Sequence, residues 1–370
     1  MPLPRVEFLD VSLATASRGR TADILELILS ALPRWKTCEL PDVLTRSMSG
    51  IAPSPDLLER VEITGSAWHR LDSEVFNRAP RLYAWKGPFT ALPWAQIREL
   101  DITEFTMAGH TFTHILTVCP ALVKLRLCLS RDPVWMDGPP RALSRLEEAT
   151  FVVGYPDIFA PMFGKLTTPR LKYLQLWGVS KADLGSRPGY ARRMLRLDAW
   201  PLTEFTGWLH RSQCTLDTFS LLTIAMPRDH VVAILERLPS LESFTIWEDY
   251  EPDAAWAEVA DEPIVYSSID DGLLRRMTAV DGAAPSLLPR LKRLSIKGEL
   301  QFNHSALVDM VRSRSKPHLE YLRIYAGGQS RPDDMDEDIK AQLRVAMGED
   351  GIMEFDSSAS ISKSVDFMSV

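Results

Sequence analysis

This sequence of 370 residues contains little asparagine, no recognisable cysteine motif and no long apolar run. Its four cysteines show no C-x-x-C spacing, which is typical of reduced, mostly buried thiols in an intracellular protein. No segment approaches a run of about 18 uncharged apolar residues, so we expect no membrane-spanning helix and no membrane partner. Residues 1–7 contain no apolar core, so we expect no signal peptide and a cytoplasmic or nuclear location.

Catalytic signatures are missing as well. The sequence has no G-x-S-x-G, G-x-x-x-x-G-K-[ST], G-x-G-x-x-G or H-E-x-x-H motif, which are patterns of enzyme active sites. His110 and His114 stand four residues apart in an expected helix, but no acidic third ligand is nearby in the sequence, and a structural zinc site needs four ligands. We therefore predict no catalytic residues, no metal and no cofactor. A hydrolase site within two irregular segments, 178–200 and 248–271, is the less favoured alternative.

The charges are mixed, with a modest acidic excess. The sequence has 42 Lys and Arg against 49 Asp and Glu, a net charge of −7, so nucleic acid is not an expected partner. One short basic run, residues 312–316, is interpreted as a solvated helix end. Acidic residues gather in segment 248–271, which predicts a loop projecting from the body of the protein.

Leucine recurs in a strand pattern, L-x-x-L-x-L, in which other apolar residues can replace leucine. Start-to-start distances from residue 97 onward are 25, 24, 25, 45, 25, 50 and 28 residues. A weaker copy begins at Leu82. This period lies within the range of leucine-rich repeats, which is about 20–29 residues. The strands are expected at residues 58–63, 97–102, 122–127, 146–151, 171–176, 216–221, 241–246, 291–296 and 319–324.

Helical patterns lie between many of these strands, at residues 21–32, 110–118, 229–238, 305–311 and 336–347. The sequence thus predicts an α/β leucine-rich-repeat solenoid, a horseshoe with parallel strands on the concave face and helices on the convex face. It would occupy residues 1–356, with insertions at about 178–200 and 248–271. A Ser-rich tail, 357–370, is expected to be disordered. Repeats built from helix pairs are disfavoured, because the period is short and the strand ends are β-branched or aromatic.

Within each strand pattern, alternation predicts that positions 1, 4 and 6 point into the core and positions 3, 5 and 7 point to the concave face. Trp177 and Trp247 share position 7, and we expect them about three strands, or roughly 15 Å, apart. Aromatic and Arg side chains favour protein interfaces. The alternative is that an inserted loop buries them. The predicted partner-binding residues are Tyr173, Gln175, Trp177, Trp247, Arg293, Lys297, Tyr321, Arg323 and Tyr325.

Four phrases carry a resemblance to a known family: ALPRWK at 31–36, VFNRAPRL at 75–82, LPWAQI at 92–97 and WLHRSQCTL at 208–216. They resemble the repeat region of fungal F-box proteins, and the resemblance covers about residues 4–355. It implies repeats that hold a protein to be ubiquitylated by a cullin–RING ubiquitin ligase.

The F-box itself is not recognisable in the sequence. Residues 24–35 echo one superficially, but they stand where the family places its first repeat helix. The ligase adaptor is therefore an expected partner only if an F-box is encoded upstream. The favoured function is a non-enzymatic protein-interaction module, the substrate-receptor repeat region of such a ligase. A leucine-rich-repeat scaffold unrelated to ubiquitin is the alternative.

Overall fold

The structure is a computed structural model, and it describes residues 30–41, 54–64, 74–102, 109–129, 139–179, 195–197, 199–248, 268–280, 284–298, 302–314, 319–326, 335–348 and 351–357. Residues 1–29, with which the predicted solenoid would begin, lie outside these ranges. So do most of the helix expected at 21–32 and all of the predicted tail after Ser357.

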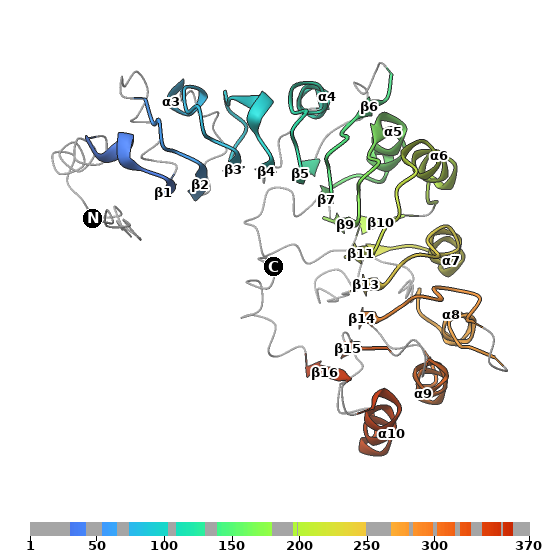
Figure 1. Cartoon of the computed structure of the whole chain (residues 1–370). Coiled ribbons are helices and arrows are strands. Elements are labelled where there is room, and N and C mark those ends of the chain that lie inside the picture. Colours follow the sequence, from blue (N-terminus) through green and yellow to red (C-terminus); the bar gives the residue numbers. More distant parts are fainter. Residues whose placement is uncertain are drawn as a thin grey trace, which may run out of the picture.

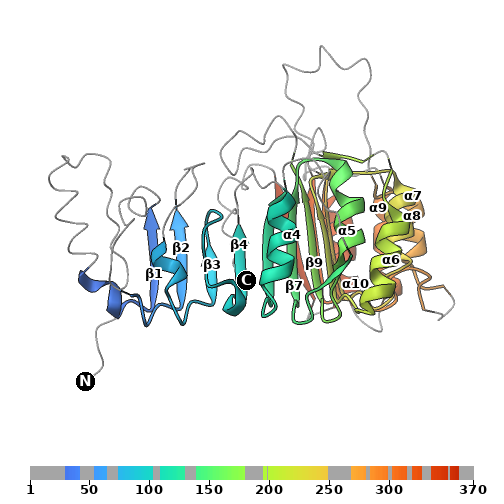
Figure 2. The same cartoon turned by 90° about the horizontal axis from the view of Figure 1, so that it is seen from above.

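Twelve parallel strands form one sheet and follow one another across it in chain order. Figure 2 shows the strands pointing in one direction, and Figure 1 shows the sheet curving with the helices on its outer side. The expected α/β fold with a parallel sheet is confirmed. The strands are β1 (Thr37–Pro41), β2 (Arg60–Thr64), β3 (Ala84–Lys86), β4 (Glu99–Ile102), β5 (Lys124–Leu129), β7 (Glu148–Val153), β9 (Tyr173–Gly178), β11 (Thr218–Leu222), β13 (Ser243–Trp247), β14 (Arg293–Gly298), β15 (Tyr321–Ala326) and β16 (Ile352–Ser357).

All nine strands expected from the leucine pattern are present, each beginning two residues after the first leucine-type position. The weaker copy at Leu82 supplies β3. Two strands, β1 and β16, were not predicted. In register with their neighbours, Cys38 and Met353 occupy the core-facing fourth position, and neither residue type belongs to the search pattern.

Helices connect consecutive strands along the outer face (Figure 1). The helices expected at 110–118, 229–238, 305–311 and 336–347 are confirmed within three residues as α4, α7, α9 and α10. In the part of the chain that the structure describes, no helix is long and apolar enough to cross a membrane. The bounds are η2 (Leu32–Arg34), α3 (Glu74–Asn77), η3 (Trp94–Gln96), α4 (Gly109–Val118), η4 (Pro156–Ile158), α5 (Phe159–Lys165), α6 (Leu202–Ser212), α7 (Arg228–Leu235), α8 (Asp271–Arg276), α9 (His304–Ser313) and α10 (Glu337–Met347).

Two of the helices that the sequence did not predict, α5 and α6, depend on tertiary packing. Pro161 and Gly164 lie within α5, and Gly207 lies within α6, so the intrinsic helix propensity of both segments is low. They are held instead by a cluster of aromatic rings. Phe163 lies 5.1 Å from Phe205, 5.4 Å from Trp208 and 5.6 Å from Trp200, between ring centroids. Such contacts stabilise short helices that are marginal alone.

The core lies between the sheet and the outer helices. Positions 1, 4 and 6 of β9 are Leu171, Leu174 and Leu176, and each is at most 1% exposed. In register, Leu174 lies between Ala149 of β7 and Phe219 of β11. The predicted inward alternation is therefore confirmed. The same positions are buried on β2 to β15, and half-buried Cys38 of β1 and Met353 and Phe355 of β16 pack against them, so one apolar core runs beneath the sheet.

In the large sheet β9 pairs directly with β11, so segment 178–200 places no strand between them. Its described part forms β10 (Leu195–Arg196), which pairs with β12 (Ile224–Ala225) in a separate small sheet. The close approach of β10 and β12 to the end of β9 requires glycine at position 178, because a Cβ there would lie 2.5 Å from the Cβ of Leu195. A second small sheet pairs β6 (Arg141–Ala142) with β8 (Leu166–Thr167).

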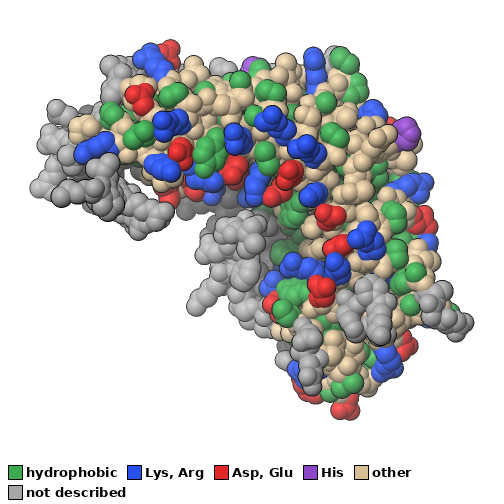
Figure 3. Space-filling view, viewed as in Figure 1, with side chains coloured by type: hydrophobic (Ala, Val, Ile, Leu, Met, Phe, Trp, Pro, Cys, Tyr) green, Lys and Arg blue, Asp and Glu red, His purple; other side chains and the backbone are tan. Residues whose placement is uncertain are grey.

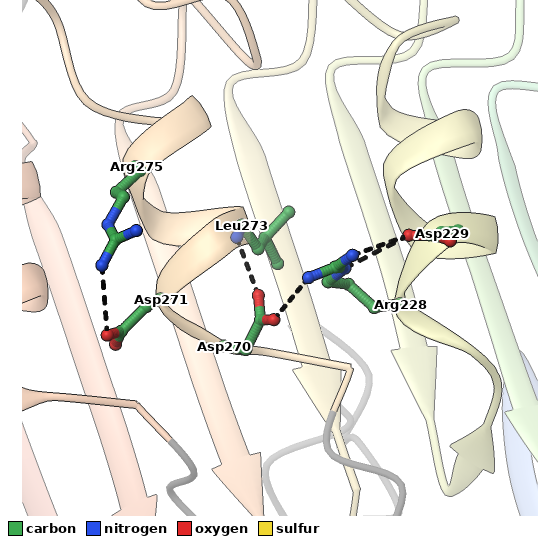
Figure 4. A network of polar contacts seen from close by, with 6 residues as sticks. All are labelled: Arg228, Asp229, Asp270, Asp271, Leu273 and Arg275. Carbon is green, nitrogen blue, oxygen red and sulfur yellow. Dashed lines mark hydrogen bonds and ion pairs between the residues drawn. The ribbon is translucent and has the colours of Figure 1, made fainter.

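The end of the acidic segment 248–271 belongs to the folded body rather than to a projecting loop. Asp270 is the N-cap of α8 and accepts a hydrogen bond from the Leu273 N–H at 2.9 Å. Its other oxygen accepts a hydrogen bond from Arg228 of α7 at 2.7 Å. Figure 4 shows this network, in which Asp271 also faces Arg275. These contacts tie α8 to α7, so the sequence-based interpretation is wrong for this end. Residues 249–267 lie outside the described residues.

The basic run 312–316 is not simply a solvated helix end. Arg312 is exposed and pairs with Asp309, but Arg314 is only 3% exposed. The Arg314 guanidinium donates to the carbonyl oxygens of Met277, Leu287 and Leu288 at 2.9–3.1 Å. Burial lowers the pKa of Arg314 to about 10. The interpretation as a solvated helix end is therefore wrong for Arg314. Its planar guanidinium carries several N–H donors, which can bind several carbonyl oxygens at once.

Candidate functional site

The inner face of the curved sheet carries three rows of side chains, one row for each outward position of the strands. The row at the carboxyl ends of the strands, here called the upper row, comprises Cys128, Val152, Trp177, Leu222, Trp247, Lys297 and Tyr325. These seven residues are consecutive register partners across β5, β7, β9, β11, β13, β14 and β15. Six intervals of about 4.8 Å between neighbouring strands give the row a length of about 29 Å.

Apolar contacts join the first three members of the upper row, and the row as a whole is here called the ridge. Trp177, which is half-buried, packs against a cluster of Cys128, Val152 and Val179 that is separate from the main core. Leu222 is 2% exposed and stands between Trp177 and Trp247 in register. From Cys128 to Trp247 the ridge therefore consists of apolar side chains on consecutive strands.

Trp247 connects the ridge to the last strands. Its ring lies 6.2 Å from the Tyr325 ring in an edge-to-face arrangement, and the Lys297 ammonium is 5.8 Å from the Trp247 ring. The Trp247 indole N–H donates to the Ser295 hydroxyl at 3.3 Å. These contacts hold the half-buried indole in a defined orientation on a rigid sheet.

Backbone strain marks the middle of this ridge. Thr223, directly after Leu222, has a φ of 50°, which is a rare conformation for a β-branched residue. Its N–H donates to the Trp247 carbonyl at 2.7 Å, and its hydroxyl donates to the Gly178 carbonyl. The strained residue thus links the strand ends that carry Trp177 and Trp247. Strain of this kind is concentrated at binding and catalytic sites.

The N-terminal part of the inner face is charged and internally paired. Glu62 pairs with Lys86 at 2.6 Å and Lys124 with Glu148 at 2.8 Å, each across adjacent strands. Arg60 reaches Glu99 at 2.6 Å, passing over the small Ala84 that separates them in register. In the view of Figure 3, basic and acidic side chains interleave along this arm of the curve. The charges of this region are therefore already neutralised within the protein.

Asp101 and Arg126 continue this pairing toward the upper row. Their closest charged atoms are 3.9 Å apart, and the Arg126 guanidinium lies 5.9 Å from the Trp177 ring. Burial raises the pKa of Asp101, an effect that Arg126 and Lys86 partly oppose. Arg126 therefore lies between the paired charges and the apolar ridge.

On β9, β11 and β13 the inner face carries no charged side chain. Besides the upper row, its residues are Tyr173, Gln175, Thr218, Ser220, Ser243 and Thr245. The Thr150 hydroxyl of β7 donates to Gln175 at 3.2 Å. Burial raises the pKa of Tyr173, and a hydrogen bond with Ser220 opposes the shift. The centre of the face is thus neutral and rich in hydroxyl groups.

The inner face of β14 and β15 again carries charged side chains, which here lie next to aromatic rings. The exposed Arg293 lies 5.3 Å from the Tyr321 ring, and Arg323 lies 4.3 Å from the Tyr325 ring. Glu354 of β16 pairs with Arg323 at 3.0 Å and accepts a hydrogen bond from the Tyr321 hydroxyl at 2.9 Å. These cations on aromatic faces form the C-terminal border of the neutral centre.

A buried carboxylate follows Trp247 directly. Glu248 is 5% exposed and accepts the Ser268 N–H at 3.0 Å, while its own N–H donates to the Lys297 carbonyl at 2.6 Å. Burial raises its pKa to about 7, against the hydrogen bonds from Ser268. A Cβ at Gly298, where φ is 153°, would lie 2.8 Å from the Glu248 carbonyl oxygen. Sequence reasoning placed Glu248 in a solvated acidic loop, and its burial is a correction.

The nine residues predicted to bind a partner all occupy inner-face positions, and the structure brings them together on β9 and on β13 to β15. Two expectations were wrong. Trp177 and Trp247 are two strands apart, not three, since segment 178–200 gives the large sheet no strand; their strands are therefore about 10 Å apart. Lys297 and Tyr325 are buried, at 8% and 5% exposed, rather than open to solvent.

Sequence reasoning missed three members of the upper row, Cys128, Val152 and Leu222. They occupy the same seventh position as the two tryptophans, and that shared position was the available signal. Cys, Val and Leu are not among the residue types most enriched at protein interfaces, as Trp, Tyr and Arg are. Their contribution arises from continuity with Trp177 and Trp247 along the row, which only the strand order reveals.

The described residues contain no group of three or more His, Cys, Asp and Glu side chains that could hold a metal ion. His114 lies on α4, and the side chain of His110 is outside the described part. Burial raises the pKa of Cys38, Cys119 and Cys128 to about 12 and that of Cys214 to about 11. These thiols are protonated at neutral pH and therefore weak nucleophiles. A hydrolase site in residues 180–194 or 249–267 would lie outside the described residues.

No protein-family model matches the chain, and no curated protein sequence matches it at a significant level.

Proposed function

We propose that this protein is a leucine-rich-repeat solenoid that acts as a non-enzymatic protein-interaction module. Support for the solenoid comes from the strand period of about 25 residues, the parallel sheet in chain order and the outer helices. In such an array each unit buries its apolar side only against its neighbours, which leaves a long rigid inner face for binding.

The continuous upper row is the observation that carries this proposal. Trp177, Leu222 and Trp247 form an apolar line on a rigid sheet, and aromatic anchors of this type dominate the energetics of protein interfaces. Its length of about 29 Å suits a protein–protein footprint of about 800 Å² per side. The neutral, hydroxyl-rich centre next to it can supply hydrogen bonds to a partner without the energetic cost of burying charged groups. We assign the partner-contacting role to this C-terminal half of the face.

Within this class, we propose a substrate receptor of the F-box type. Its support is the resemblance of phrases such as 75–82 and 208–216 to the repeat region of fungal F-box proteins. The inner face would hold the protein to be ubiquitylated. Because the chain has no recognisable F-box, we expect it not to bind the ligase adaptor in a pull-down with purified components. Stoichiometric adaptor binding would contradict this expectation.

The test of the interaction module is quantitative binding to an identified partner. Partners enriched on the immobilised chain would be purified and titrated against the wild type, Trp177→Ala, Trp247→Ala and the matched control Arg60→Ala on the same face. We expect each tryptophan change to weaken binding by about 2 kcal/mol or more and the Arg60 change to have little effect. Unchanged affinity in both tryptophan variants, with unchanged circular dichroism, would refute the proposal.

A further inference from the structure

We propose that the edge of the large sheet at the amino ends of its strands is a second binding surface, which takes a short carboxylate-rich segment of a protein partner. The surface, here called the basic edge, comprises five exposed cations next to β3, β4, β7 and β9: Arg81, Arg98, Arg145, Arg170 and Lys172. It lies at the opposite ends of the strands from the upper row, so the inference goes beyond the proposed function.

Three of these cations are placed by the same backbone turn. The Leu171 N–H donates to the Thr168 carbonyl at 3.2 Å, which closes a four-residue turn with Arg170 at its third position. The equivalent turns before β3 and β7 place Arg81 and Arg145 at the same position. Because β7 and β9 pair directly, the turns that carry Arg145 and Arg170 are neighbours, about 4.8 Å apart.

The other two cations, Arg98 and Lys172, stand directly before the first residues of β4 and β9. The Arg98 N–H donates to the Tyr83 carbonyl at 2.8 Å, and the Lys172 N–H donates to the Glu147 carbonyl at 3.0 Å. The sheet thus fixes the backbone of the basic edge before a partner arrives, which lowers the entropic cost of binding. Figure 3 looks onto the amino ends of the strands, and Lys and Arg side chains gather there over β4 to β9.

The cations of the basic edge are unpaired, unlike those of the inner face. On neighbouring strands of the inner face, Arg60, Lys86 and Lys124 each bind a carboxylate at 2.6–2.8 Å. Within the described part of the chain, no carboxylate forms an ion pair with any cation of the basic edge. Like charges on adjacent strands are unfavourable without a counter-ion. An anionic partner would therefore relieve the repulsion between Arg145 and Arg170.

An open pocket gives a carboxylate a place within the basic edge. It lies between the turns that lead into β7, β9 and β11 and is lined by Glu147, Pro169, Arg170, Leu171, Lys172 and Thr215. A guanidinium can bind a carboxylate through two parallel N–H donors, and a lysine ammonium adds a compact charge beside it. Among the described residues, Glu147 forms no ion pair, so Arg170 and Lys172 are both available to a partner.

The ends of the basic edge limit the length of the partner segment. Before β2, Glu59 and Lys36 form a neutral pair at 3.4 Å, and before β11 the exposed Asp217 reverses the charge. Four strand intervals separate β3 from β9, which is about 19 Å, and an extended segment of about six residues covers this distance. A nucleic acid strand would continue onto Asp217, and the net charge of −7 also opposes a long polyanion. A short acidic protein segment therefore fits best.

The turn before β14 provides a matched comparison within the same fold. Arg290 and Lys292 occupy the positions there that Arg170 and Lys172 occupy before β9. Both donate to Glu242, at 3.1 Å and 2.8 Å. The same two residue types at the same two positions are thus neutralised before β14 and unpaired before β9.

The experiment uses the full chain and fluorescein-labelled hexaglutamate, measured by fluorescence anisotropy at low salt. Hexaglutamine and hexalysine test the charge, while a labelled single-stranded oligonucleotide and sedimented phosphatidylserine vesicles test other anionic partners. The probes are titrated against the wild type and the double variant Arg170→Gln/Lys172→Gln. The matched control, Arg290→Gln/Lys292→Gln, removes the same two charges where they are already paired. Trp177→Ala tests whether the peptide binds the upper row instead.

We expect hexaglutamate to bind at least about tenfold more tightly than hexaglutamine, with a preference that decreases as salt rises. Arg170→Gln/Lys172→Gln should weaken hexaglutamate binding at least about fivefold, because charge-assisted hydrogen bonds are lost. The matched control should weaken it by less than about twofold, and Trp177→Ala should leave it unchanged. Circular dichroism and thermal melting check that each variant is folded, as expected for exposed side chains.

Several results would overturn the inference: no binding of hexaglutamate, equal binding of hexaglutamine, equal losses in the two double variants, or tighter binding of the oligonucleotide or the vesicles. Loss of hexaglutamate binding in Trp177→Ala would also overturn it, because the peptide would then occupy the upper row. Failure here leaves the proposed function standing, since that is tested by the tryptophan variants with an identified partner.

Discussion

On strands β2 to β7 the inner face carries charges that neutralise one another, whereas on β9 to β15 it carries indoles, phenol rings and cations. Both parts are built on the same strand geometry and the same core positions. The difference lies only in which residue types occupy the outward positions. Paired exposed charges keep water and contribute little to binding, while half-buried aromatic rings gain from further burial. One sheet thus carries a region of paired charges and a region that we propose for binding.

The largest expected effect tests what the two parts share. Leu174→Ala on β9 and Leu125→Ala on β5 each remove a core leucine that is at most 3% exposed. Each should lower the free energy of unfolding by about 2–5 kcal/mol, since a cavity replaces packed side chain. Urea titration followed by circular dichroism measures the loss. A cost below about 1 kcal/mol at either site would mean that its strand register is wrong.

One pH dependence should arise in the aromatic part, at Glu248 directly after β13. The raised pKa of Glu248, about 7 against an ordinary 4.5, favours the neutral carboxyl in the folded state. Its stabilising contribution is complete below about pH 4.5 and is lost as the pH rises through 7. The loss amounts to about 3 kcal/mol.

Glu248→Gln removes this titration. Between pH 4.5 and pH 8.5 the unfolding free energy of the wild type should therefore fall relative to that of the variant. Urea unfolding at each pH measures this difference. A difference that is constant across this range would show that the carboxyl does not titrate in the folded protein.

Binding should separate the two parts directly. Trp177→Ala or Trp247→Ala should weaken partner binding by about 2 kcal/mol or more, because each removes an aromatic anchor from the centre of the surface. Isothermal titration calorimetry gives the affinity. Lys86→Ala in the charged part should change the binding free energy by less than about 0.5 kcal/mol. A larger loss would show that the charged part also contributes to binding.

The smallest effects are expected from the charge pairs themselves. Lys124→Met removes the partner of Glu148, and both side chains are about half exposed. The change in unfolding free energy should stay within about 1 kcal/mol, and the difference should shrink at high salt. Thermal melts at low and high ionic strength measure it. A loss of several kcal/mol would show that the pairing holds the sheet together.

Much of the fold could be predicted from the residues alone, because the strand signal is local and repeated. The leucine pattern located nine strands, and alternation correctly assigned Leu171, Leu174 and Leu176 to the core. The pattern missed β1 and β16, whose core positions hold Cys38 and Met353. Helices α5 and α6 were not predicted for a different reason. They depend on ring packing around Phe163 rather than on helix propensity.

The candidate surface could be predicted only in part. Residue types and the shared seventh position pointed to Trp177 and Trp247, but the number of strands between them depends on whether segment 178–200 joins the sheet. Pairing of β10 with β12 decides this, and it is a contact between distant parts of the chain. In the same way, the burial of Arg314 and Glu248 depends on backbone groups brought near them by folding.

The sequence by itself determined the strand period, the inward face of each strand and the kinds of side chain on the outward face, because each of these depends on spacing along the chain. Only the tertiary structure decided which outward residues become neighbours. Strand order and register unite Cys128, Val152, Leu222 and the two tryptophans in one row. They also pair the N-terminal charges and bury Glu248 and Arg314. The reason is physical: burial and pairing depend on distances in space between residues that lie far apart in the sequence.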